Sequence, residues 1–155
     1  MEKNTELIEV LNDLIQINND RLTGYEKASK ALSAADVDLK AIFTQMSAQS
    51  RKYTTELSAE VGRLGGEPST STTASGKIYR AWMDVKAVFT GKDRHAVLES
   101  CEYGEDAAQK AYDHALKTDA MLDTNTRQMI ANQKSELRTS HDTIKKYRDM
   151  HEIVK

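Results

Sequence analysis

The sequence contains very little of what builds sheets, disulfide frameworks or membrane spans. A single proline and seven glycines occur in 155 residues, so long stretches of the chain carry no helix breaker. Cys101 is the only cysteine, which excludes an intrachain disulfide, and we expect it to be a small buried residue. No run approaches the roughly 18 consecutive apolar residues that a membrane-spanning helix requires.

Charge of one sign is not in excess either. The formal net charge is −2, and acidic and basic residues are interspersed, so we expect no basic face for nucleic acid and no binding to membranes. The N-terminus MEKNTELIEV lacks the layout of a signal peptide, and a cytoplasmic location is expected. The abundance of Ala, Lys, Glu and Leu favours an all-α chain, and its length suits a single domain over residues 1–155.

Apolar side chains recur at helical spacing in four long segments. They predict helices over residues 5–32, 37–64, 94–116 and 124–150, and a short helix over 76–89. Leu22 is predicted to lie on the inward stripe of the first helix and Asp20 outside it. Asp36 is the expected N-cap of the second helix, and Gly65 with Gly66 is its expected end. Two helical hairpins joined by a connection of roughly thirty residues are typical of a bundle with a long crossover.

Polar residues interrupt the apolar stripes of the first and third helices. Asn18 precedes Tyr25 by seven residues, and Glu105 precedes Tyr112 by the same interval. A polar group buried without a partner loses about 1–3 kcal/mol, so each of these positions needs one. The shared pattern indicates a degenerate internal repeat of hairpins.

The second and fourth helices carry a related pair of segments. QMSAQSRKY aligns without gaps on QMIANQKSE, which places Ser50 and Tyr53 opposite Gln133 and Glu136. Ser50 and Gln133 both fall on the predicted inward stripes.

This layout resembles the ferritin-like superfamily. Within it the chain is most similar to a family of small bacterial four-helix-bundle proteins classed as a domain of unknown function. The similarity is carried by LNDLIQINNDRLTGYEKA, SRKYTTEL, GRLGGEP, GKIYRAWMDVKAV, CEYGEDAAQKAYDHAL and SHDTIKKYRD. The resemblance implies a ferritin-like four-helix bundle of two antiparallel hairpins, with the short fifth helix in the crossover.

The resemblance also implies a di-metal site, but the residues do not supply one. In the superfamily the first and third helices each provide an inward Glu, and the second and fourth provide Glu-x-x-His. The first of these positions is occupied here by Asn18, and the second-helix pair by Ser50 and Tyr53. Gln133 and Glu136 occupy the fourth-helix pair. Only Glu105 clearly keeps a central carboxylate, whereas two metal ions need about four carboxylates and two imidazoles.

We therefore predict a hydrogen-bonded polar layer in place of a metal centre, in a non-enzymatic protein that needs no cofactor and acts through self-association or another protein. The predicted layer comprises Asn18, Tyr25, Ser50, Tyr53, Glu105, Tyr112 and Gln133. Glu105 would then be held by Tyr25, Tyr53, Asn18 or Gln133.

Two alternatives stay open at this point. The first is an iron-binding oxidative or storage-type protein with a shifted ligand set of Glu102, Glu105, Glu136 and His141. The second is a small ligand bound among the polar groups of the bundle core. The short helix over 76–89 is expected to pack on the bundle or in a dimer interface.

Overall fold

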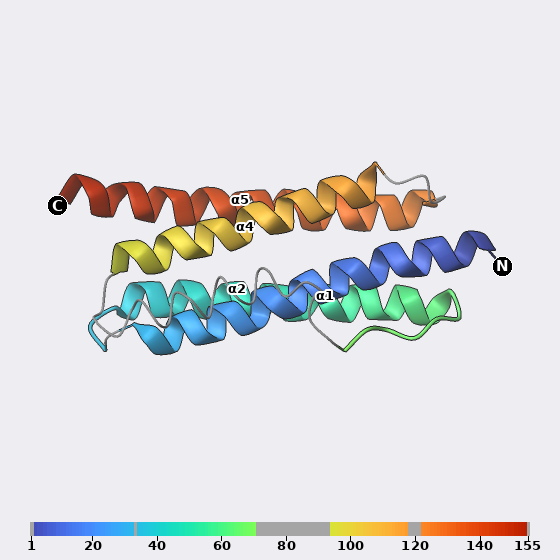
Figure 1. Cartoon of the computed structure of the whole chain (residues 1–155), viewed down its shortest axis with the longest axis horizontal. Helices are drawn as coiled ribbons and strands as arrows, with labels where there is room; N and C mark the ends of the chain where they lie inside the picture. Colours follow the sequence, from blue (N-terminus) through green and yellow to red (C-terminus); the bar gives the residue numbers. More distant parts are fainter. Residues whose placement is uncertain (1, 33, 71–93, 118–121, 155) are drawn as a thin grey trace.

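The computed structural model describes residues 2–32, 34–70, 94–117 and 122–154, which form four long helices and no strand (Figure 1). These helices are α1 (Glu2–Ala31), α2 (Val37–Arg63), α4 (Arg94–Leu116) and α5 (Thr124–Val154). α1 begins three residues earlier than the spacing predicts, and α5 ends four residues later. The short helix predicted over 76–89 lies outside the described residues.

The helices form two hairpins packed against each other, α1 with α2 and α4 with α5 (Figure 1). α2 ends at the end of the bundle where α1 begins, and α4 begins at the opposite end. The residues that directly follow α2 lie against α1. The amide nitrogen of Asn12 donates to the Glu67 carbonyl at 3.1 Å, and the Ser69 backbone N–H donates to the Asn12 oxygen at 2.8 Å.

The core follows alternating steps of three and four residues along each helix. On α1 and the residue that follows it, the buried positions of this kind are Leu7, Leu11, Leu14, Asn18, Arg21, Tyr25, Ala28 and Leu32. The predictions for Leu22 and Asp20 are wrong, because Leu22 is partly exposed and Asp20 is buried. Ile15 and Ile17 are buried as well, so α1 is covered over a wider arc than a single stripe. Among the described helices, none is both long and apolar enough to cross a membrane.

The two ends of α2 differ in how well the sequence predicts them. Gly65 has a φ of +86°, and the backbone N–H groups of Gly65 and Gly66 donate to the carbonyls of Gly62 and Val61 at 3.0 and 2.9 Å. This pair of hydrogen bonds is a Schellman motif, as the glycines indicate. At the other end, Asp36 occupies the N-cap position but makes no side-chain capping hydrogen bond. Its carboxylate instead pairs with Arg94 at 2.8 Å, which ties the start of α4 to the start of α2.

Replacing Gly65 by alanine is expected to lower the free energy of unfolding by about 1 kcal/mol, because an L-residue is disfavoured at positive φ. Urea denaturation followed by helical circular dichroism would measure the change. Gly62→Ala is the matched control, since Gly62 lies within the helix and a Cβ there would meet no atom within 4 Å. That variant should gain stability by about 0.5 kcal/mol. Equal effects of the two substitutions would contradict the assignment of the helix end.

Candidate functional site

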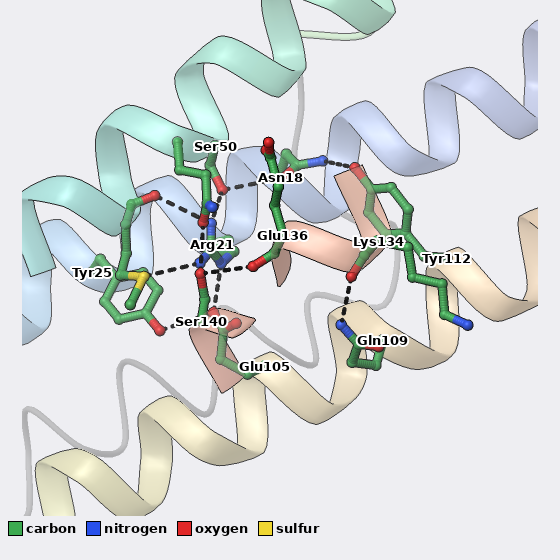
Figure 2. A network of polar contacts seen from close by, with 12 residues as sticks. Asn18, Arg21, Tyr25, Ser50, Glu105, Gln109, Tyr112, Lys134, Glu136 and Ser140 are labelled. Carbon is green, nitrogen blue, oxygen red and sulfur yellow. Dashed lines mark hydrogen bonds and ion pairs between the residues drawn. The ribbon is translucent and has the colours of Figure 1, made fainter. Parts of the chain in front are cut away.

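The polar residues on the inward stripes meet at the middle of the bundle. All seven residues of the predicted polar layer have side chains that are almost completely buried: Asn18, Tyr25, Ser50, Tyr53, Glu105, Tyr112 and Gln133. They come from all four described helices, and Figure 2 shows most of them converging around Arg21. Each helix turns a side chain inward every three or four residues, so polar residues from the four helices can lie at one level of the bundle and form a layer.

An ion pair forms the centre of this layer. Nε of Arg21 on α1 donates to Oε1 of Glu105 on α4 at 2.5 Å, and the two side chains are 2% and 0% exposed. The hydroxyl of Tyr25 donates to the same carboxylate oxygen at 2.8 Å. Nη1 of Arg21 donates to the Ser50 hydroxyl at 2.9 Å and to the Met46 carbonyl at 3.2 Å on α2. Arg21 therefore joins three helices through charge-assisted hydrogen bonds.

From Arg21 a chain of five hydrogen bonds runs in one direction through the layer, and its part from Ser50 through Asn18 to Tyr112 can be followed in Figure 2. Arg21 donates to Ser50, and the Ser50 hydroxyl donates to the Asn18 oxygen at 3.1 Å. The Asn18 amide donates to the Tyr112 hydroxyl at 2.8 Å, which donates to the Gln133 oxygen at 2.6 Å. The remaining bond, from Gln133 to Glu56, is 3.0 Å long.

This chain has a cation at its origin and a carboxylate at its end. Each hydroxyl or amide along it both accepts and donates, so the bonds polarise one another in the same sense. Tyr53 lies apart from the chain, because its hydroxyl donates to Glu136 at 2.6 Å.

Burial and charge set the protonation states of the layer. Burial raises the pKa of Tyr25 well above its usual value, and the Glu105 carboxylate adds to this effect. Burial likewise raises the pKa values of Tyr53 and Tyr112, which keeps both hydroxyls neutral. Burial is the largest single influence on the pKa of Arg21 and would lower it, but Glu105, Tyr25 and Tyr53 together raise it, and the net pKa is raised. The layer thus holds one positive guanidinium among neutral donors.

Comparison with known proteins assigns the sequence to a family. The family described as "Domain of unknown function (DUF2383)" matches residues 6–118. The chain belongs to this family. Its fold is similar to that of a solved mutant of Dps1 from Mycobacterium smegmatis, with a TM-score of 0.78 and 11% sequence identity over 95% of this chain and 97% of that chain. No curated protein matches the sequence.

These comparisons confirm two expectations from the sequence. The family membership confirms the resemblance to a domain of unknown function. The structural similarity confirms an all-α, ferritin-like four-helix bundle. At 11% identity the similarity shows the fold alone.

In this DUF2383 protein the partners of Glu105 differ from those that the sequence suggests. Tyr25 does contact Glu105, but Asn18 and Gln133 contact Tyr112 instead. The main partner, Arg21, is missing from the predicted set. The spacing along the helix could have identified Arg21 as an inward residue, because it follows Asn18 by three residues and precedes Tyr25 by four.

The four residues of the shifted ligand set do not converge. Glu105 is paired with Arg21, Glu136 accepts from Tyr53, and Glu102 forms an ion pair with Arg148. His141 contacts Asp106 through Nε2 at 2.7 Å. Within the described ranges, no group of three or more His, Cys, Asp or Glu side chains is arranged to hold a metal ion.

The residues of this layer do not fit the di-metal group that the fold family implies. A metal pair needs several anionic ligands around one point, whereas three of the corresponding positions carry the neutral side chains of Asn18, Ser50 and Gln133. The guanidinium of Arg21 already contacts Glu105 and Ser50. A cation supplied by the chain itself therefore balances the one central carboxylate.

Proposed function

We propose that this protein is a non-enzymatic ferritin-like bundle in which Arg21 replaces bound metal as the central positive charge, and which acts through self-association or contact with another protein. The observation that carries this proposal is the buried Arg21–Glu105 pair at 2.5 Å. The resemblance to ferritin-like proteins assigns Glu105 to a ligand position of their third helix, and here its partner is Arg21. No cofactor is needed to neutralise the layer.

The polar layer suits a rigid scaffold. A buried ion pair contributes little net stability compared with apolar side chains, but it favours one alignment of the helices. Here Asn18 and Arg21 of the first hairpin donate to Tyr112 and Glu105 of the second, respectively. The layer therefore fixes how the hairpins pack against each other. The mixed surface charge and net charge of −2 support a protein partner over nucleic acid.

Iron loading tests the proposal directly. Protein purified without chelator would be offered ferrous iron under air, with near-ultraviolet absorbance followed by elemental analysis. We expect no stoichiometric iron and no oxo-bridged absorption. Glu105→Gln keeps the shape of the side chain but leaves Arg21 without its counter-charge, so its folding is first verified by circular dichroism; it should change neither result. Stoichiometric iron that disappears in Glu105→Gln would overturn the proposal and favour the shifted ligand set.

The oligomeric state separates the two modes of interaction. Sedimentation velocity across a range of protein concentrations would show whether the chain self-associates. A single monomeric species throughout would exclude self-association and leave another protein as the partner.

A further inference from the structure

A groove between α2 and α5 lies directly over the polar layer. It has a volume of about 340 Å³, and its lining includes Ile42, Gln45, Met46, Gln49, Thr139 and Ser140. Apolar groups of Ile42 and Met46 form part of the wall, while amides, hydroxyls and the carboxylate of Glu136 supply polar edges. This mixture of apolar surface and a few polar groups is typical of small-molecule sites.

The groove exists because α2 and α5 pack less closely than the other neighbouring helices. Side-chain hydrogen bonds join them instead. The Ser140 hydroxyl donates to Gln49 at 3.0 Å, and Tyr53 donates to Glu136 at 2.6 Å. Water can replace such bonds at small cost where they are partly exposed, so this side of the bundle yields most easily to a bound molecule.

Met46 forms the wall between the groove and the buried cation. Its side chain lines the groove, and its sulfur accepts a hydrogen bond from Nη2 of Arg21 at 3.3 Å. Among the described residues, this sulfur is the one acceptor that Nη2 reaches, although Nη2 carries two N–H groups. A thioether is a weak acceptor, so one end of a fully buried guanidinium is poorly satisfied.

The net charge of the Arg21–Glu105 pair decides which kind of ligand could accept a hydrogen bond from Nη2 of Arg21. Glu105 already neutralises Arg21, so an added anion would leave a buried net negative charge, which is costly. A neutral molecule with a strong acceptor oxygen would improve the hydrogen bonding of Nη2 and leave the charge balanced.

We propose that the α2–α5 groove binds a small neutral molecule with an amide-type carbonyl and a short apolar tail. The carbonyl oxygen displaces the Met46 sulfur and accepts from Nη2 of Arg21, while the tail packs against Ile42 and the displaced Met46 side chain. This proposal does not depend on the absence of metal, and it would hold if the bundle bound iron outside the α2–α5 groove.

N-propylacetamide is a suitable probe, with pentanoate as the anionic molecule of the same size. The protein would be labelled with ¹³C at its methionine methyl groups, and the Met46 signal assigned by its loss in Met46→Leu. We expect a saturable shift of the Met46 signal with a dissociation constant on the order of millimolar. Met129, which lines the adjoining cavity of about 370 Å³, should not shift. Pentanoate should bind at least roughly tenfold more weakly, because its charge is not balanced.

Two variants keep the proposal falsifiable. Arg21→Lys retains the charge but removes the planar donor group, and should weaken the amide at least roughly tenfold. Ile42→Trp fills the groove without touching the polar layer, and should abolish the Met46 shift. The proposal is overturned if Met46 shows no saturable shift, if pentanoate binds as tightly as the amide, or if Ile42→Trp leaves the shift unchanged.

Discussion

Replacing Arg21 by methionine is expected to lower the free energy of unfolding by about 3–5 kcal/mol. The substitution keeps a long side chain but removes the partner that, within the described ranges, brings positive charge to Glu105, whose side chain is fully buried. Removing one member of a buried ion pair leaves an uncompensated charge, and this is what makes the loss so large. Ser50 and the Met46 carbonyl would lose their donor as well. Urea denaturation followed by circular dichroism would measure the change.

Two further variants show whether the loss comes from the unpaired charge. Adding Glu105→Leu to Arg21→Met removes both charges and should recover most of the stability, because an apolar pair can replace a buried ion pair at little cost. Arg51→Met is the matched control, since Arg51 pairs with Glu26 on the surface at 3.3 Å. It should cost less than about 1 kcal/mol. A similar loss in Arg21→Met and Arg51→Met would show that the central pair is not buried as described.

Raising the pH above 10 is expected to unfold the protein steeply. Burial raises the pKa values of Tyr25, Tyr53 and Tyr112 in the folded state from an ordinary value of 10.0. Above pH 10 the unfolded chain therefore releases protons that the folded chain keeps. Stability from these groups is complete below pH 10 and falls by roughly 3 to 4 kcal/mol for each further pH unit, because about 1.4 kcal/mol is lost per tyrosine.

Absorbance at the tyrosinate band and circular dichroism, recorded together during an alkaline titration, would test this behaviour. The buried tyrosines should ionise only as the helical signal is lost, in one cooperative step. Tyr103→Phe is the control, because Tyr103 is exposed and its removal should leave the midpoint unchanged. If all six tyrosines of the chain ionised gradually around pH 10 while the helical signal persisted, the three hydroxyls would have to be accessible to solvent.

These two predictions concern the same physical feature. The centre of the bundle is polar, but almost every polar group in it is hydrogen bonded or paired. Oε2 of Glu105 is an exception among the described residues, since it is buried with no hydrogen-bond partner. A layer of this kind is tolerant of exchange for a fully apolar layer and intolerant of losing one member.

The sequence by itself determined the helices and the burial of the seven predicted layer residues, but not that of Asp20 and Arg21. The three-four spacing of residues such as Leu11, Leu14 and Asn18 depends only on the geometry of an α-helix, so it predicts which side chains turn inward before any neighbour is known. The helix end at Gly65 is also local, because positive φ favours glycine wherever the chain turns there.

The partners of the inward residues were decided only by the tertiary structure. Asp36 sits where a capping residue is expected, yet its carboxylate turns to Arg94, which is 58 residues away in the sequence. Arg21 and Glu105 are separated by 84 residues, and spacing along one helix cannot indicate which level of another helix lies opposite. That level depends on how the hairpins pack, and a buried charge is stable only where packing brings its counter-charge within hydrogen-bonding distance.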